Sequence, residues 1–165
     1  MTLELRKWLL SADDLHHVRL QAHDNSWAAV QHGEAISEQK GARNQTKPTL
    51  EQVLLLVRFC AQRLLELSEC CGAGNDILWT ALVFYQRFYA VCSPLEFDPL
   101  TVMFAALHLA CLSEEVRELT LDALLQAAEL GSDSMFKAKV AAVEFYVMEG
   151  IGFGLLIEPK PATGL

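Results

Sequence analysis

The sequence predicts a single all-α domain, and three observations support this fold class. Apolar residues recur at the 3.6-residue period of a helix along most of the 165 residues. Capping residues, proline and glycine mark the ends of these stretches, and alternating apolar and polar runs with hairpin turns do not occur. Residues of the types A, V, I, L, M, F, W, Y and C make up 52% of the chain, which excludes overall disorder. This fraction exceeds what a domain of this size needs for its core, so we expect part of the surplus to form a partner surface.

The N-terminal region is predicted to form one helix before the main body. We expect this helix to begin near Ser11, because Ser11 and Asp14 resemble a capping box. The residues expected on its apolar face are Leu15, Val18 and Ala22. The residues expected outside that face are His16, Arg19 and His23.

Composition divides the chain into four parts. Residues 1–30 are assigned to the N-terminal helix, and residues 31–48 to a polar linker that is rich in glycine and other loop-forming residues. Residues 49–157 form the predicted helical body, and residues 158–165 form a tail that contains two prolines.

The body is predicted to contain five helices. They are expected at about residues 50–69, 76–91, 99–112, 120–130 and 134–149. Thr49 and Asp98 are cap residues, and Pro99 occupies the first helical position that proline favours. Gly131 and Gly150 are expected to close the last two helices. Because the third of these five helices is apolar all round, we expect it to lie at the centre of the body.

Charge and cysteine usage restrict the partners and the compartment. The formal net charge is −8, and no Lys/Arg cluster occurs, so direct binding to nucleic acid is not expected. No run of 18 apolar residues and no signal peptide are visible, so we expect no membrane partner. The cysteine count of 5 is odd, and two of these cysteines are adjacent. This pattern is typical of reduced thiols in the nucleus or cytoplasm.

No catalytic, cofactor-binding or metal-binding constellation emerges from the residues. Gly72-Ala73-Gly74 is interpreted as helix punctuation, because a phosphate loop would need a further glycine and a preceding strand. Cys70 and Cys71 lack the gap that lets two thiolates bind one zinc ion. His108 and Cys111 share a helical face, but we interpret both as core residues of the central helix. The sequence therefore does not indicate an enzyme.

One long stretch resembles the cyclin box. It carries Arg87-Phe88-Tyr89-Ala90, Ser93, Asp98-Pro99, Leu109-Ala110 and Glu114-Glu115. The later stretch from Glu144 to Pro159 resembles the last helix of the box and its exit. Trp8-Leu9-Leu10 with Asp14-Leu15 is similar to the N-terminal helix of the transcriptional cyclins, first of the cyclin C type and then of the cyclin H type. The resemblance implies one cyclin box of five helices over residues 49–157.

This resemblance implies a regulatory subunit that binds and positions a cyclin-dependent kinase. It also implies a transcription-associated complex, of the Mediator kinase module or TFIIH type, and a nuclear location that can extend to the cytoplasm. The family's interface residues correspond to Leu112, Glu114, Glu115, Glu144, Met148, Phe153 and Leu155. No cofactor is implied. Glu114 and Glu115 remain open to a second interpretation, as a solvated pair at a helix end.

Two departures from the family pattern leave alternatives open. Leu112 stands where the family has a lysine that works with the glutamate matched by Glu144, so a non-activating protein-interaction adaptor is an alternative function. Only one box is present, which fits a single-box cyclin, a fragment or a truncated isoform. A cyclin-fold transcription factor similar to TFIIB is disfavoured by the charge of −8. Arg87 is open to a role in an ion pair within the box.

The apolar surplus also has an expected location. We expect an exposed patch around the end of the central helix and the exit of the last helix. Its predicted members are Leu112, Met148, Phe153, Leu155 and Leu156. An exposed apolar patch of this kind usually marks a partner site.

Overall fold

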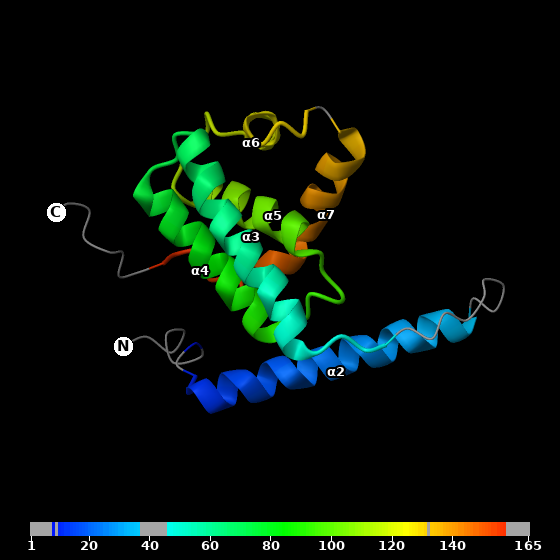
Figure 1. Cartoon of the computed structure of the whole chain (residues 1–165). Helices are drawn as coiled ribbons and strands as arrows, with labels where there is room; N and C mark the ends of the chain where they lie inside the picture. Colours follow the sequence, from blue (N-terminus) through cyan, green and yellow to red (C-terminus); the bar gives the residue numbers. More distant parts are fainter. Residues whose placement is uncertain (1–7, 9, 37–45, 132, 158–165) are drawn as a thin grey trace.

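The computed structural model describes residues 8, 10–36, 46–131 and 133–157 of the chain. The helices in this part are α2 (Ala12–Ile36), α3 (Leu50–Cys70), α4 (Asn75–Val91), α5 (Pro99–Ser113), α6 (Leu121–Ala127) and α7 (Ser134–Gly150). These ranges contain no strand (Figure 1). The all-α fold class is therefore confirmed, with an N-terminal helix before a five-helix body.

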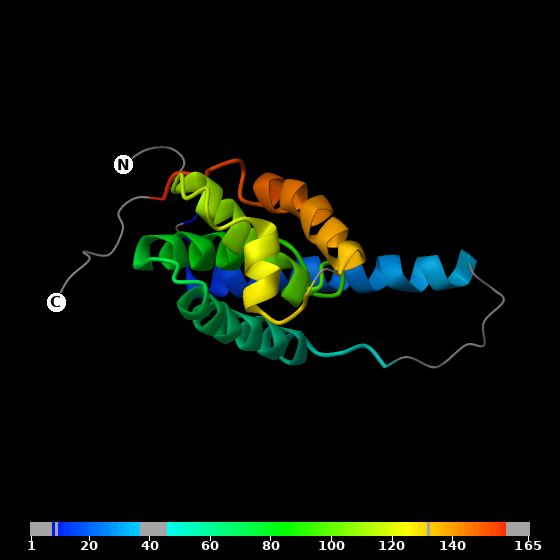
Figure 2. The ribbon, with the colours of Figure 1, turned by 90° about the horizontal axis from the view of Figure 1, so that it is seen from above.

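Helix α5 is the centre of the body. It contacts α3, α4, α6 and α7, and Figure 1 shows it enclosed by these helices. All residues from Thr101 to Leu107 are buried, as the apolar sequence of this helix requires. Helix α2 lies outside this body against α3 and α4, and its C-terminal half extends past them (Figure 2).

Side-chain caps set the starts of the body helices. The Thr49 hydroxyl accepts a hydrogen bond from the Gln52 amide (3.2 Å), and the Gln52 side chain accepts one from the Thr49 amide (2.8 Å). At the starts of α5, α6 and α7, first-turn backbone amides donate to the side chains of Asp98, Thr120 and Asp133. Each such cap stabilises a helix by about 1 kcal/mol, so the cap positions that the sequence indicates also fix these helix starts.

An aromatic cluster joins α4 to its neighbours. The rings of Tyr85, Tyr89, Phe88 and Phe97 meet edge to face at 5.1–5.2 Å. The Tyr85 hydroxyl donates to the Val57 carbonyl (3.2 Å), and the Tyr89 hydroxyl donates to the Phe97 carbonyl (2.9 Å). Burial raises the pKa of both phenols. The polar ends of these rings thus have partners inside the core, as buried tyrosines require.

Helix α2 differs from its prediction in length and in its buried face. It continues to Ile36, so the first residues of the predicted 31–48 linker are helical. His23 is only 2% exposed, and its Nε2 lies 2.9 Å from the Pro48 carbonyl oxygen. The Arg19 Nε donates to the Tyr89 carbonyl (3.1 Å). Placing Arg19 and His23 outside the packed face was therefore wrong, because this helix docks partly through polar contacts to backbone carbonyls.

The ends of the last two helices also differ from prediction. Helix α6 stops at Ala127, and Glu129 (φ 57°) already leaves the helical region before Gly131. Gly150 is the last residue of α7, and Gly152 (φ 69°) makes the left-handed turn. A Cβ on Gly150 would lie 2.8 Å from a ring carbon of Phe88. Gly150 is thus required for close packing of α7 on α4 rather than for helix closure.

Two predicted segments lie outside the described residues. These are most of the linker, residues 37–45, and the tail, residues 158–165. Within the described part, no helix is both long and apolar enough to cross a membrane.

Candidate functional site

The residues proposed for partner binding gather at the end of α5, on α7 and on the segment that leaves α7. Leu112 and Phe153 are exposed at 55% and 59%, and Leu156 is also exposed. Met148 and Leu155 are only partly exposed and pack against the core. The expected apolar patch is therefore present, but Met148 and Leu155 form its inner edge rather than its surface.

Glu144 is held across the junction of α5 and α7. One of its carboxylate oxygens lies 2.5 Å from Nδ1 of His108, and both side chains are 18% exposed. His108 is therefore not a simple core residue of α5, and interpreting it only as core packing was wrong. Cys111 does not have the character of a nucleophile, because its thiol is fully buried and burial raises its pKa to about 11. Glu144 thus has a partner within the chain, although Leu112 stands where the family pattern has a lysine.

The end of α5 is fixed by contacts to α4. The Thr80 hydroxyl donates to a carboxylate oxygen of Glu114 (2.8 Å), so this carboxylate contacts α4 within the chain. Glu115 is exposed and has a φ of 58°, which is uncommon for a residue with a side chain. The Val116 amide then donates a hydrogen bond to the Cys111 carbonyl (2.9 Å). Of the two glutamates, Glu115 presents its side chain to solvent and Glu114 supports the fold.

The segment after α7 folds back over the end of α5. The Ser113 hydroxyl donates to the Leu155 carbonyl (2.8 Å), which ties this segment to the last residue of α5. The Phe153 amide donates to the Met148 carbonyl (2.7 Å), and Phe153 has a φ of 55°. A non-glycine residue in this region carries backbone strain of about 1–3 kcal/mol. The turn therefore holds the Phe153 ring outward against an energetic cost.

The sequence did not single out two aromatic residues of this surface. Phe145 is 56% exposed, and its ring centroid lies 6.4 Å from that of Phe153 and 6.1 Å from that of Tyr146. Tyr146 is also exposed. One feature of the sequence could have indicated them: α7, like α5, carries apolar residues on every side, and because α7 lies at the edge of the body some of these residues must be exposed. We call Leu112, Glu144, Phe145 and Phe153 the α5–α7 face.

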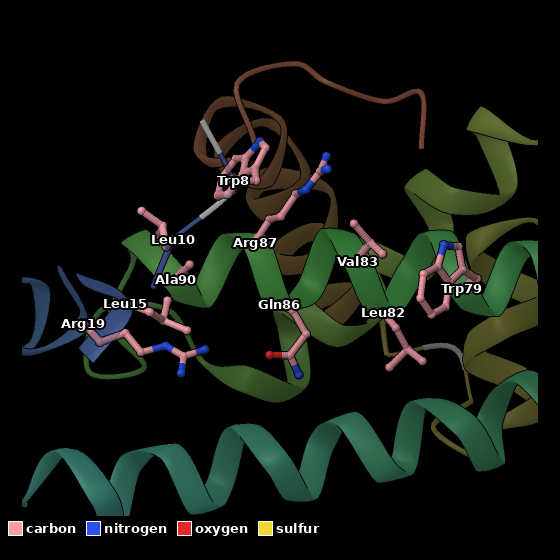
Figure 3. A pocket seen from close by; sticks show the side chains of 10 residues that line it. All are labelled: Trp8, Leu10, Leu15, Arg19, Trp79, Leu82, Val83, Gln86, Arg87 and Ala90. Carbon is pink, nitrogen blue, oxygen red and sulfur yellow. The ribbon is translucent and has the colours of Figure 1, made fainter. Parts of the chain in front are cut away.

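A hollow separate from the α5–α7 face lies between α4, α2 and the residues before α2. It encloses about 500 Å³ and is lined mainly by apolar side chains (Figure 3). The Arg87 guanidinium lies 5.1 Å from the centre of the Trp8 ring, an attractive cation–π distance. Arg87 therefore helps to attach Trp8 to α4. Arg19 and Trp79 lie along the same hollow, as Figure 3 shows.

The described residues do not provide a metal site or a reactive thiol pair. In the ranges that the structure describes, no group of three His, Cys, Asp or Glu residues could hold a metal ion. All five cysteines are free thiols. Burial raises the pKa of Cys92 and Cys111 to about 11, so both are protonated and poorly nucleophilic at neutral pH.

Comparison with known proteins gives consistent relatives, although no family model matches the chain. It is 26% identical to Cyclin CCL1 of Saccharomyces cerevisiae over 93% of its length, and 29% identical to Cyclin mcs2 of Schizosaccharomyces pombe over 64%. It is 19% identical to the Putative cyclin-H of Dictyostelium discoideum over 93% of its length. The chain is therefore similar to these three cyclins. It spans 34–50% of the length of these three cyclins.

Solved structures confirm the cyclin fold. One match is to a chain of the yeast TFIIK (Kin28/Ccl1/Tfb3) complex, with a TM-score of 0.69, 22% identity, and coverage of 95% of this chain and 57% of that chain. Another is to a chain of the CAK complex of Chaetomium thermophilum bound to ATP-gamma-S, with a TM-score of 0.79, 22% identity, and coverage of 96% and 47%. Helices α3 to α7 are thus the five helices of one cyclin box, and α2 precedes them as in the predicted order.

Proposed function

We propose that this chain is a cyclin-like regulatory subunit that binds and positions a transcription-associated cyclin-dependent kinase. The proteins that it resembles are cyclins, and similar folds occur in two complexes, one of which contains Kin28, Ccl1 and Tfb3. The relatives support a complex of the TFIIH type. The alternative complex in this proposal is a Mediator kinase module. The proposed location is the nucleus, with the cytoplasm as a further location.

The observation that carries the proposal is the composition of the α5–α7 face. It combines exposed large apolar side chains with one carboxylate, Glu144, that is held in place by His108. Aromatic and aliphatic anchors around a few fixed polar groups are typical of the centre of a protein–protein interface. The docking residues that we propose are Leu112, Glu114, Glu115, Glu144, Met148, Phe153 and Leu155. Of these, Leu112 and Phe153 are exposed, whereas the Glu114 carboxylate contacts Thr80 on α4.

The proposed action is positional rather than catalytic. Protein kinases require an ion pair between a lysine and a glutamate of a mobile helix before phosphoryl transfer proceeds. A rigid helical face that packs on that mobile helix favours its active position, and the regulatory subunit then needs no catalytic group of its own. The apolar core around α5 provides the rigid support that this action needs.

The first test asks whether the chain recovers a kinase and whether reversing the charge at Glu144 weakens that binding. A tagged chain is used to purify partners from nuclear extract, which are identified by mass spectrometry. The Glu144→Arg variant is expected to weaken the recovered kinase's affinity at least tenfold, about 1.4 kcal/mol, because it places an unpaired cation in the face. Glu69→Arg is the matched control, since Glu69 is exposed on α3, which does not contact α7.

The outcomes separate the proposal from its alternatives. Recovery of no kinase would reject the regulatory function. An unchanged affinity of Glu144→Arg for a recovered kinase would leave the function standing and reject this docking face. Circular dichroism of both variants checks that the box remains folded.

A non-activating adaptor is the second candidate, and the exposed Leu112 favours it. A leucine offers no hydrogen-bond donor to a kinase backbone, so binding could occur without activation. In the adaptor case, Leu112→Lys is expected to raise the activity of a reconstituted pair severalfold. Leu65→Lys, at another exposed leucine on α3, controls for the added charge. Equal activity of the wild type and Leu112→Lys would argue against the adaptor.

A further inference from the structure

The pair formed by His108 and Glu144 connects the two helices that carry the α5–α7 face. The His108 Nδ1 and the Glu144 Oε1 are 2.5 Å apart, and each side chain is largely shielded from water. A shielded carboxylate without a partner destabilises a fold and an interface alike. His108 therefore supplies Glu144 with a partner from within the chain, before any other protein binds.

The position of His108 gives this pair its significance. His108 and Leu112 are four residues apart on α5, so they lie one turn apart on the same side of the helix. On the facing helix, Glu144 and Met148 have the same spacing. In the family pattern the partner of the matching glutamate is the lysine at position 112, whereas in this chain position 112 carries a leucine and His108, one turn earlier, contacts Glu144.

We propose that His108 is the positioning residue of the α5–α7 face, which holds the Glu144 carboxylate ready for a donor on the kinase. This inference rests on the proposed function. His108 takes over the supporting role that a lysine at position 112 has in the family pattern, one helical turn earlier. Position 112 is then released for an apolar contact.

The chemistry of histidine suits this role. An imidazole is short and planar, and here its ring is packed between α5 and α7, so it orients the carboxylate with less loss of side-chain entropy than a lysine. A carboxylate has two oxygens and room for several hydrogen bonds, so the bond to His108 leaves acceptor capacity for a partner. The kinase surface expected here has a hydrogen-bond donor opposite Glu144 and an apolar side chain opposite Leu112.

A matched pair of variants tests whether His108 acts through Glu144. His108→Leu replaces the imidazole with an apolar side chain of similar size and so removes the donor, whereas His108→Gln keeps a donor. The kinase recovered with the wild-type chain is the probe, and its dissociation constant is measured by biolayer interferometry. We expect roughly tenfold weaker binding for His108→Leu and a change within about threefold for His108→Gln.

Moving the donor by one turn gives a result that a purely structural role would not produce. The double variant His108→Leu with Leu112→Lys places a cation at the family position, and it is expected to recover most of the lost affinity. In a Glu144→Ala background, His108→Leu is expected to cause no further loss, because its effect passes through Glu144. His16→Ala, on an exposed part of α2, is the control for histidine replacement.

Three results would overturn the inference. They are wild-type affinity for His108→Leu, equal losses for His108→Leu and His108→Gln, and failure of the added lysine to restore binding while thermal unfolding shows an intact fold. If Glu144→Arg weakens binding but His108→Leu does not, the proposed function survives and only the role of His108 fails. If no kinase is recovered, the proposed function fails and this inference fails with it.

Discussion

Helices α2 and α5 are held in the molecule by different kinds of interaction. Helix α5 is buried on all sides and carries only two polar side chains before Ser113, Thr101 and His108. Helix α2 packs on one side only, and two of its anchors are Arg19 and His23, which bind backbone carbonyls. Burial of apolar surface stabilises the first, and a few hydrogen bonds position the second. The body should therefore resist unfolding far more strongly than the attachment of α2.

The largest expected effect is loss of a core ring on α5. Phe104 is 1% exposed, and its ring meets that of Phe136 on α7 edge to face at 5.5 Å. Phe104→Ala is expected to lower the free energy of unfolding by about 3–5 kcal/mol, measured by urea denaturation. Phe59→Ala on α3, where the ring is 57% exposed, should change it by less than about 0.5 kcal/mol. Equal effects at the two sites would contradict the central position of α5.

A smaller effect is expected at Gly150, where α7 packs closely against α4. Gly150→Ala places a Cβ 2.8 Å from the Phe88 ring and should cost about 1–3 kcal/mol through overpacking. Gly33→Ala in α2 is the matched control, because nothing lies within 4 Å of its added Cβ. There the same change should stabilise the helix by up to about 1 kcal/mol. Thermal denaturation of both variants would show whether the two effects have opposite signs.

The smallest expected effect concerns the attachment of α2. Arg19→Met removes the hydrogen bond to the Tyr89 carbonyl and should weaken docking of α2 by about 1 kcal/mol, with little change in body stability. Limited proteolysis is expected to cut within α2 earlier than in the wild type. Arg63→Met, at an exposed position of α3, is the control. Earlier cleavage within α3 to α7 instead would show that α2 and the body unfold together.

The same contrast explains how much the sequence could predict. Apolar periodicity and the caps at Thr49 and Asp98 located the body helices to within a few residues, whereas the Asp133 cap of α7 was not predicted. The buried face of α2 was missed because its anchors are polar, and their acceptors belong to residues far away in the sequence. His108 was assigned to the core for the related reason that no local pattern shows Glu144, 36 residues later, lying beside it.

The candidate site divides along the same line. The exposed Leu112 and Phe153 follow from a helix end and a helix exit, which local sequence can indicate. The partial burial of Met148 and Leu155 depends on how the exit segment folds back onto Ser113. The exposure of Phe145 could not be predicted, because the periodicity of an apolar helix does not indicate which of its residues face solvent.

Because other helices enclose α5, amide hydrogen exchange in this helix can report the stability of the whole domain. Its amides from Phe104 to Leu107 are hydrogen-bonded within a helix that other helices surround. Such amides exchange their hydrogens with solvent only when the entire domain opens, so their exchange rates report global stability. Binding of the proposed kinase partner should slow exchange in α5 even at residues that touch no partner, because a ligand that binds only the folded state stabilises all of it.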